Sequence, residues 1–240
     1  MLLEARKIVV AYDDILAVDG VDFDLAAGEL VSIIGANGAG KSSILNSIMG
    51  WVPLKSGTLR FQGRNITGLP THLRARSGIR TVPERARIFP RLTVFENLMT
   101  GIFGLRKRLP VEERMAWVYE LFPILKEKQD DPAGTLSGGQ QQQLSIARAI
   151  ISSPKLLLVD EISMGLMPKL ATQVFELLRR LNEKHGLSIL LVEQNAVASL
   201  AISHRAYVLE TGAVVRQGAA SELAADPKIR DVYLGTGDVR

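Results

Sequence analysis

Residues 30–50 read LVSIIGANGAGKSSILNSIMG, and this stretch decides the fold. The short apolar run Leu30–Ile34 predicts a buried strand, and Ser43–Met49 has apolar residues at helical spacing before Gly50. Between them, Gly35–Ser42 matches the pattern G-x-x-x-x-G-K-[ST]. Glycine lets successive backbone N–H groups turn toward phosphate oxygens, and the following helix directs its positive N-terminal end at the same anion. The sequence therefore predicts a phosphate-binding loop between a strand and a helix.

This loop predicts a nucleoside triphosphate as the ligand and Mg²⁺ as its companion, and the family resemblance described below implies that the nucleotide is ATP. Lys41 is expected to reach the β- and γ-phosphates, and the Ser42 hydroxyl is expected to bind Mg²⁺. A glycine-rich turn that precedes a helix by chance is the alternative, and the flanking strand and helix weaken it. The residues expected to hold the nucleotide are Gly35, Ala36, Asn37, Gly38, Ala39, Gly40, Lys41, Ser42 and Ser43.

A second apolar strand, Leu156–Val159, ends in the two carboxylates Asp160 and Glu161. In a parallel sheet this strand end would lie beside the phosphate loop. Asp160 could then hold Mg²⁺, and Glu161 could orient or deprotonate the attacking water. An apolar strand that ends in Asp-Glu is common by itself, so the prediction depends on its pairing with Lys41.

The stretch Leu136-Ser137-Gly138-Gly139-Gln140 opens another predicted helix. Ser137 and Gln140 have the spacing of a capping box, which is a structural role. A helix N-terminus with two glycines and a serine hydroxyl is also an anion site. Because the chain already has a complete phosphate loop, this second anion site predicts a second protein chain in a head-to-tail dimer.

The rest of the chain fits one α/β domain. Its 240 residues are 47% hydrophobic and 22% charged, as in ordinary globular proteins, and there is no cysteine. The first quarter is rich in predicted strands, residues 92–131 are predicted helical, and strands then alternate with helices, which indicates a largely parallel sheet. The N-terminus does not have the pattern of a secretory signal, and no apolar run approaches the about 20 residues of a membrane helix.

Together these motifs resemble the nucleotide-binding subunits of ABC transporters over essentially the whole chain. More narrowly, GANGAGKS, VPERARIFPRLTVFENL, LSGGQQQ and VEQNA are similar to the shorter of the two ATPase subunits of branched-chain amino-acid importers. Importers of urea or short amides use close relatives, so they stay open as an alternative. The resemblance implies one P-loop NTPase domain of ABC type over residues 1–240. It would have a mostly parallel RecA-like sheet, an N-terminal antiparallel β-subdomain and a helical insertion at about 88–150 that carries LSGGQ.

The resemblance also implies roles for residues outside the phosphate loop. Tyr12 stands where the family stacks an aromatic ring on adenine; a strand-end tyrosine in the core is the alternative. Glu84 stands where most relatives have a glutamine that touches Mg²⁺, and an exposed loop acid is the alternative. Gln194 stands where most relatives have a histidine that contacts the γ-phosphate, so it is expected to be catalytic together with Glu161. The partner's site would be completed by Ser137, Gly138, Gly139 and Gln140.

Two further positions depart from the family pattern. Ile162 replaces a proline after Glu161, and Met167 replaces an aspartate in the loop expected to contact the partner's site. Gln194 can donate a hydrogen bond to a phosphate oxygen but cannot carry the charge of a histidine. We therefore expect slower hydrolysis at this chain's phosphate loop than at that of a sibling subunit. Equal losses in single-turnover hydrolysis, on changing Glu161 to glutamine here and its counterpart in the sibling, would contradict this.

Positive charge is concentrated in one stretch of sequence. Residues 60–91 carry a local charge of +7, against +4 for the whole chain. The arginines are Arg60, Arg64, Arg74, Arg76, Arg80, Arg85, Arg87 and Arg91. In relatives this region faces membrane subunits, so docking there is expected, with an ordinary solvated face as the alternative.

The resemblance implies an assembly at a membrane. The expected partners are a second ABC ATPase subunit, two transmembrane permease subunits and, indirectly, an extracytoplasmic solute-binding protein; nucleic acid is not expected. A heterodimer with a sibling ATPase is favoured, although a homodimer could form in isolation. The chain is expected to lie peripherally on the cytoplasmic face of the inner (plasma) membrane.

Other classes of function fit the sequence less well. An ABC-type ATPase of DNA repair or translation carries long coiled-coil insertions or paired ATPase domains, for which 240 residues leave no room. A P-loop kinase or GTPase would not need LSGGQ. A nucleotide-sensing module without hydrolysis stays open because of Gln194 and Met167, although Glu161 argues against it.

Overall fold

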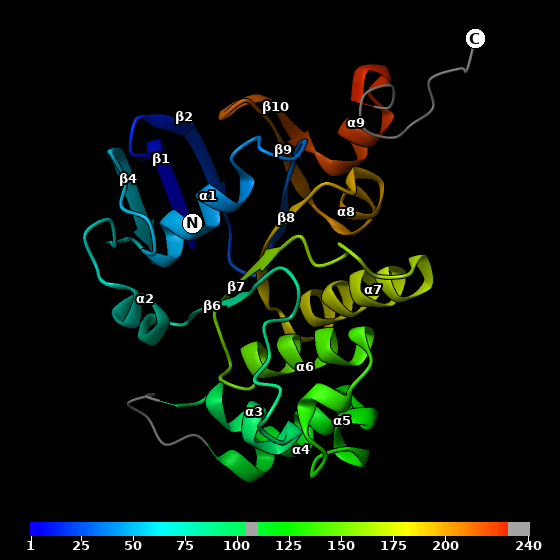
Figure 1. The fold of residues 1–240 in the computed structure, drawn as a ribbon. Helices are drawn as coiled ribbons and strands as arrows, with labels where there is room; N and C mark the ends of the chain where they lie inside the picture. The colour runs from blue at the N-terminus through cyan, green and yellow to red at the C-terminus, as the bar shows by residue number, and fades with distance from the viewer. Residues whose placement is uncertain (104–109, 230–240) are drawn as a thin grey trace.

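The computed structural model describes residues 1–103 and 110–229, which form two β-sheets with helices between and around them (Figure 1). The antiparallel sheet has the order β2-β1-β4-β5 and contains β1 (Leu3–Tyr12), β2 (Ile15–Leu25), β4 (Ser56–Phe61) and β5 (Arg64–Asn65). The other sheet has the order β10-β9-β3-β8-β7-β6 and contains β3 (Leu30–Ile34), β6 (Ile79–Val82), β7 (Leu156–Asp160), β8 (Ser188–Glu193), β9 (Arg205–Glu210) and β10 (Ala213–Ala219). Its pairs are parallel except β9–β10. The predicted fold class is confirmed.

The helices divide into groups around the second sheet (Figure 1). They are α1 (Lys41–Met49), α2 (Thr71–Ser77), α3 (Val94–Thr100), α4 (Val111–Leu121), α5 (Pro123–Glu127), α6 (Gly138–Ile150), α7 (Pro168–His185), α8 (Ala196–Ile202) and α9 (Ala220–Ala225), with a 3₁₀ turn at Ala133–Thr135. Helices α3 to α6 gather at the lower end of the molecule in Figure 1, and α6 lies beside α7. Within residues 1–103 and 110–229, no helix is both long and apolar enough to cross a membrane.

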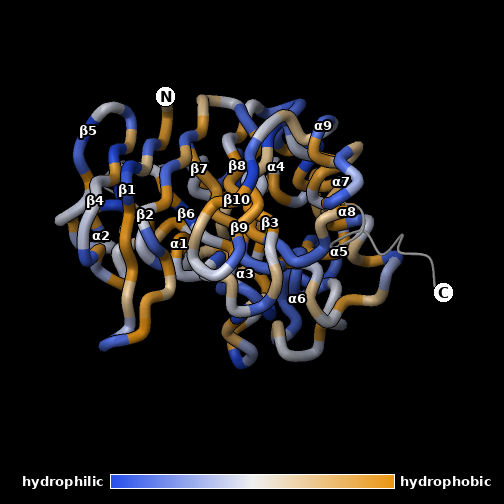
Figure 2. Tube along the Cα trace, turned by 90° about the horizontal axis from the view of Figure 1, so that it is seen from above, coloured by the Kyte–Doolittle hydropathy of each residue, from blue (hydrophilic) through white to orange (hydrophobic). Residues whose placement is uncertain are grey.

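The central strands are buried on both faces. Along β7, Leu156 and Leu158 belong to the core shared with α1 and the antiparallel sheet, whereas Leu157 and Val159 belong to the core shared with α6 and α7. This alternation follows from the period of two along a strand, and the near-continuous apolar sequence is typical of parallel strands covered on both sides. Figure 2 shows the hydrophobic residues concentrated in these central strands.

Some elements differ from the sequence-based expectation. The stretch 92–131, predicted helical, contains separate helices, and α4 ends before Phe122 because the nitrogen of Pro123 has no hydrogen to donate within a continuing helix. Helix α2 and strand β6 were not predicted. The β6 sequence, Ile-Arg-Thr-Val, is only four residues long and pairs on one side alone, at the edge of the sheet.

The arginine-rich stretch does not form one surface strip. Arg74 is 3% exposed. Its guanidinium donates to the carbonyl oxygens of Ser47, Ile48, Thr67 and Leu69, and so binds the carboxyl end of α1 to the segment before α2. It therefore serves the fold and is not available for docking. A sequence count cannot separate such a buried arginine from the exposed ones.

An ion-pair cluster joins the amino ends of β3 and β9, whereas the phosphate loop lies at the carboxyl end of β3. Arg205 Nε lies 2.6 Å from Glu29 Oε1, and Arg205 Nη2 lies 2.8 Å from Asp24 Oδ1. The amide of Ala26 also donates to Glu29. Burial raises the pKa of Glu29, but these hydrogen bonds and the charge of Arg205 outweigh it, so the pKa is lowered overall.

Replacing Glu29 by glutamine is expected to cost about 1–2 kcal/mol of unfolding free energy near neutral pH, because a charge-assisted pair that is partly open to solvent is lost. A lowered carboxyl pKa stabilises the fold above the unfolded pKa, and this contribution disappears as the pH falls below 4.5. Urea unfolding of both proteins should therefore show a difference that shrinks in acid. A difference of the same size at neutral and acidic pH would contradict this linkage.

Candidate active site

The parallel topology brings the predicted site residues to one edge of the sheet. Strand β3 ends at the phosphate loop, its neighbour β8 ends before Gln194, and the next strand, β7, ends at Asp160. The loop after β6 carries Glu84. In open α/β sheets, ligands bind outside the carboxyl ends of the strands, so this edge is the candidate site.

The phosphate loop requires glycine for steric and conformational reasons. Gly40 has φ 103°, and a Cβ on it would lie 2.3 Å from the carbonyl oxygen of Ala17. A Cβ on Gly35 would lie 2.3 Å from the carbonyl oxygen of Leu209. Helix α1 begins at Lys41, and Gly40 provides no side-chain cap for its first N–H groups. An anion at a helix N-terminus accepts hydrogen bonds from these amides.

Lys41 connects the phosphate loop to the predicted general base. Its side chain is 2% exposed, and Nζ donates to the carbonyl oxygens of Gly35 and Ala36 at 2.9 Å each. Nζ also lies 3.0 Å from Oε1 of Glu161. The predicted pairing of Lys41 with the carboxyl end of β7 is therefore present in the structure.

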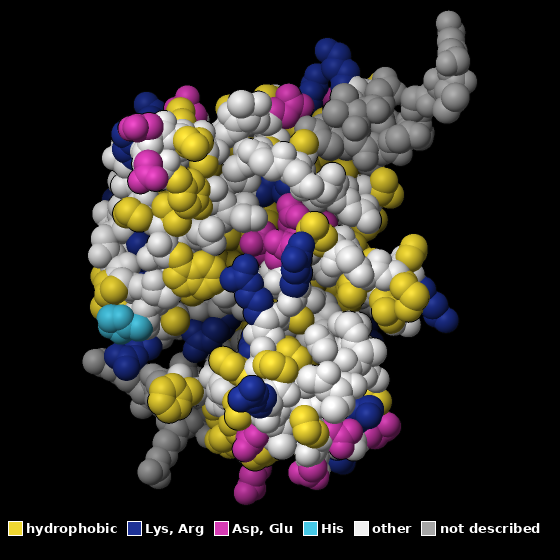
Figure 3. Space-filling model, in the orientation of Figure 1, with side chains coloured by type: hydrophobic (Ala, Val, Ile, Leu, Met, Phe, Trp, Pro, Cys, Tyr) yellow, Lys and Arg dark blue, Asp and Glu magenta, His cyan; other side chains and the backbone are white. Residues whose placement is uncertain are grey.

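A second contact, between Ser42 and Asp160, also joins the phosphate loop to the end of β7. Ser42 Oγ donates to Asp160 Oδ1 at 2.8 Å. Burial raises the pKa of Asp160, and the nearby carboxylates of Glu161 and Glu84 add to this, whereas Ser42 and Lys41 act in the opposite direction. Figure 3 shows acidic side chains gathered on this face near the end of β7, with Lys and Arg side chains beside them.

Glu161 has an unusual backbone conformation. Its φ is 40°, in the left-handed region that non-glycine residues rarely adopt. Its N–H donates to the carbonyl oxygen of Val192 in β8, at 2.9 Å. Such strained residues occur preferentially at functional sites, where surrounding contacts hold them.

Glu84 lies in a segment with unusual geometry. Its carboxylate lies 2.9 Å from Nε of Arg85, and residues 85–87 all have positive φ. Arg148, on α6, donates to the carbonyl oxygens of Ala86 and Arg87. The carboxylate is near enough to Asp160 to affect its pKa, so the structure brings Glu84 toward the site without placing it in direct contact.

Tyr12 and Gln194 are both accessible. The ring of Tyr12 ends β1, is 41% exposed and lies beside α1, where its hydroxyl accepts from Asn46 Nδ2 at 3.4 Å. The alternative of a tyrosine buried in the core is therefore wrong. Gln194 is exposed directly after β8, and its backbone N–H donates to Glu193.

The predicted capping box at the start of α6 is confirmed. The N–H of Ser137 donates to Gln140 Oε1 at 2.9 Å, and the N–H of Gln140 donates to Ser137 Oγ at 3.4 Å. Ser137 and Gly138 are exposed. In the described part of the chain, residues 137–140 make no hydrogen bond to the phosphate loop.

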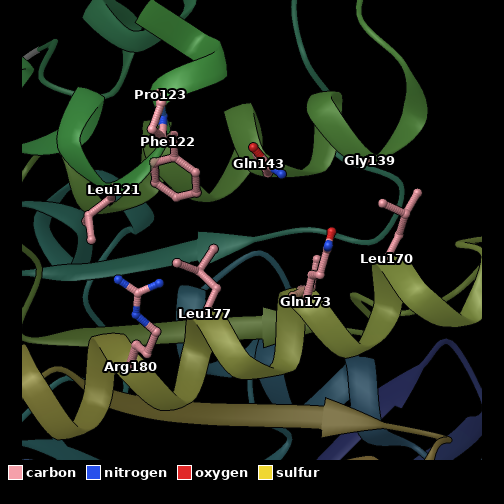
Figure 4. Close-up of a pocket in the computed structure, with 10 residues that line it drawn as sticks. Leu121, Phe122, Pro123, Gly139, Gln143, Leu170, Gln173, Leu177 and Arg180 are labelled. Carbon is pink, nitrogen blue, oxygen red and sulfur yellow. The ribbon is translucent and has the colours of Figure 1, made fainter.

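A cleft of about 280 Å³ lies behind the start of α6, between α6 and α7 (Figure 4). Gly139 borders it, and a Cβ on Gly139 would lie 2.9 Å from Leu170 Cδ1. Of the described residues that line the cleft, Arg180 is the one charged residue. The cleft lacks the clustered carboxylates and amide donors of the edge described above, so it is not the phosphate site.

Comparison with known proteins agrees with this geometry. A family profile described as ABC transporter matches residues 18–163. This chain belongs to the ABC transporter family. The ABC chain is 45% identical over 234 residues to the high-affinity branched-chain amino acid transport ATP-binding protein BraG of Pseudomonas aeruginosa, covering 98% of this chain and 100% of BraG.

Solved structures give the same assignment for this ABC ATPase. An ATP-binding cassette of an ABC transporter in its ADP conformation superposes with a TM-score of 0.84 at 27% identity, covering 98% of each chain. A dimeric ATP-binding cassette in a post-hydrolysis state, bound to ADP and Pi, superposes with a TM-score of 0.80 at 26% identity, covering 91% of this chain and 98% of the other.

Glu193 also belongs to this edge of the sheet, although it was not among the predicted site residues. Glu193 is 1% exposed at the end of β8 and accepts hydrogen bonds from the segments on either side of the site. Its sequence signal is the one that predicts Asp160, because β8, like β7, is an apolar strand that ends in an acid. The distant partner Ser163 could not be read from the sequence.

Proposed function

We propose that this ABC ATPase powers the import of branched-chain or related amino acids through membrane permease subunits. The observation that carries the ATPase part is the contact of Lys41 with Glu161 beside that of Ser42 with Asp160. The solute class is supported by the 45% identity to BraG over nearly the whole chain. A urea or short-amide importer is the alternative solute assignment.

Hydrolysis in this proposal uses residues at the edge of the sheet. The amides of Gly35–Ser43 and the start of α1 bind the phosphates, and Lys41 exchanges its contact with Glu161 for the β- and γ-phosphates. Glu161 is then free to accept a proton from the attacking water, and Gln194 donates to the γ-phosphate. Tyr12 is accessible at the end of β1 for stacking on adenine. The side chains thus supply positioning and proton transfer.

The residues also fit Mg²⁺. Ser42 Oγ and Asp160 Oδ1 are oxygen donors already in contact, and Mg²⁺ prefers oxygen ligands, commonly one or two carboxylates together with substrate phosphates and water. Glu84 is the further candidate ligand. Within residues 1–103 and 110–229, no group of three or more His, Cys, Asp or Glu forms a site by itself, which suits a metal held jointly with phosphate. When bound, Mg²⁺ would neutralise phosphate charge.

We also propose that the working ATPase is a dimer, preferably with a sibling subunit. Residues 137–140 would complete the partner's site, because Ser137 and Gly138 are exposed at the start of α6 and the four residues make no hydrogen bond to their own phosphate loop among the described residues. Two permease subunits and a solute-binding protein would complete the importer. Residues 1–240 would act as one nucleotide-binding domain with a helical subdomain at about 88–150, on the cytoplasmic face of the membrane.

The exposed part of the arginine-rich stretch is proposed to dock on the permease subunits. Reversing the charges of Arg85 and Arg87 to glutamate should weaken association with them by about tenfold, since two exposed charges near an interface contribute about 1 kcal/mol or more together. Co-purification and coupled ATPase activity measure this. Reversal of the exposed Lys126 and Lys184 is the matched control. Unchanged assembly of the Arg85 and Arg87 variant would contradict the docking role.

Uptake of radiolabelled solutes tests the transport assignment. A strain that lacks this reading frame, complemented by the unmodified chain, should regain uptake of leucine, isoleucine and valine, and a strain complemented by the Lys41→Ala variant should not. Uptake of urea and acetamide should be the same in all these strains. Restoration of urea or acetamide uptake alone would replace the amino-acid assignment by the alternative.

A further inference from the structure

Glu193 is a buried carboxylate that the hydrolysis scheme above does not use. It ends β8 and is 1% exposed. Its Oε1 accepts from the N–H of Ser163 at 2.9 Å, and its Oε2 accepts from Ser163 Oγ at 3.0 Å. Oε2 also accepts from the N–H groups of Gln194 and Asn195, at 3.2 and 3.4 Å. Both oxygens are therefore engaged by segments that border the site.

These contacts join two loops that are far apart in sequence. Ser163 lies two residues after the predicted general base, Glu161, whereas Gln194 is the residue expected to contact the γ-phosphate. The carboxylate accepts hydrogen bonds from both loops, and those from Ser163 are the shorter ones. A shift of either loop relative to the other would leave the buried carboxylate of Glu193 without one of its donors, which costs free energy.

The same contacts bear on the strained backbone of Glu161. At its own backbone, the N–H of Glu161 donates to the carbonyl oxygen of Val192 in β8. Two residues further along the chain, Ser163 is hydrogen-bonded to Glu193 at the end of the same strand. Strand β8 thus holds Glu161 on both sides, which is what a non-glycine residue with φ 40° needs in order to stay in that conformation.

Fold stability alone gives little reason for a charge here. Burial raises the pKa of Glu193, and the charge of Glu161 adds to this. The hydrogen bonds of Ser163 and Asn195 act in the opposite direction but do not outweigh burial, so the pKa is raised overall. In the described residues, no Lys, Arg or His lies within ion-pair distance of Glu193. A buried carboxylate without a cation is a costly way to end an apolar strand.

We infer that Glu193 is a positioning residue for ATP hydrolysis, which holds the Glu161 loop and the Gln194 loop in a fixed relation through Ser163 and the amides of residues 194 and 195. The inference rests on the ATPase activity and is independent of the solute transported. Glu193 acts through other residues and needs no contact with the nucleotide.

The test compares steady-state hydrolysis by the full chain and three variants. In Glu193→Gln, an amide group replaces one oxygen and faces N–H donors, so kcat should fall by about tenfold or more while the KM for ATP stays within about twofold, as for other residues that orient a catalytic group. Ser163→Ala keeps the backbone hydrogen bond and loses the hydroxyl, so a smaller fall in kcat is expected. The double variant should lose less than the product of the two separate losses, because both act on one contact.

Glu29→Gln is the matched control, since Glu29 is another hydrogen-bonded carboxylate but lies at the opposite ends of the strands. It should lower thermal stability and leave kcat per folded molecule unchanged. The inference is overturned if Glu193→Gln retains the kcat of the unmodified chain per folded molecule, or if kcat and KM change together. Should Glu193→Gln fail to fold, Ser163→Ala decides alone: an unchanged kcat overturns the inference, and a reduced kcat with unchanged KM supports it.

Discussion

Replacement of Lys41 by alanine is expected to weaken ATP binding by about a thousandfold. Lys41 is buried at the start of α1, and its ammonium is the one cation within ion-pair distance of Glu161 among the described residues. Charge-assisted hydrogen bonds contribute about 1.5–3 kcal/mol each, and two of them to phosphate oxygens account for a change of this size. Titration with a fluorescent ATP analogue measures the affinity.

The exposed Lys126 on α5 provides the matched control for Lys41. Its replacement by alanine removes the same charge and should leave ATP affinity unchanged. An affinity of the Lys41→Ala variant within about threefold of the unmodified chain would exclude the phosphate loop as the nucleotide site, given that each factor of ten corresponds to about 1.4 kcal/mol.

Replacement of Gly138 by aspartate should lower the rate of ATP hydrolysis by the assembled ATPase without changing the affinity of the altered chain for ATP. Gly138 begins α6, and a Cβ at this position meets no atom within 4 Å, so the fold accommodates the new side chain. If residues 137–140 complete a partner's site, the carboxylate will repel the phosphates there. Loss of one stabilising donor at a reacting group costs about 10²–10³ in rate, and a fall of that order is expected.

ATP affinity at the phosphate loop of the Gly138→Asp chain should stay unchanged, because this loop belongs to a different site. Gly68→Asp is the matched control, since Gly68 also has open space around its Cβ position. Phosphate release by the assembled ATPase and nucleotide titration of the single chain are the two measurements. Normal hydrolysis, or weaker binding by the altered chain itself, would contradict the two-chain site.

Features that depend on neighbouring residues could be predicted from the sequence. Strand β3 has the predicted bounds Leu30–Ile34, Gly50 has the left-handed conformation of a helix end, and Ser137 and Gln140 form their capping box. Each rests on local rules of hydrophobic period, backbone conformation or capping. The pairing of Lys41 with Glu161 could also be predicted, because parallel strands bring their carboxyl ends to the same edge.

Features that depend on distant contacts could not be predicted. The edge strand β6 is short and partly polar, and only its pairing with β7 identifies it. Arg74 looks like other surface arginines until its four carbonyl partners are known. Glu193 similarly depends on Ser163, thirty positions away. These residues satisfy buried polar groups, and a sequence does not reveal which distant segments need them.

The central claim is that this chain hydrolyses ATP with Glu161 as the general base. Phosphate release by the ATPase assembled with its membrane subunits, measured with and without Mg²⁺, tests it most directly in the unmodified chain and in Glu161→Gln. The account predicts Mg²⁺-dependent release by the unmodified chain and a fall of roughly a hundredfold or more in the variant, with ATP affinity retained, since a general base contributes about 10²–10⁴ in rate. Equal phosphate release by the two proteins would contradict it.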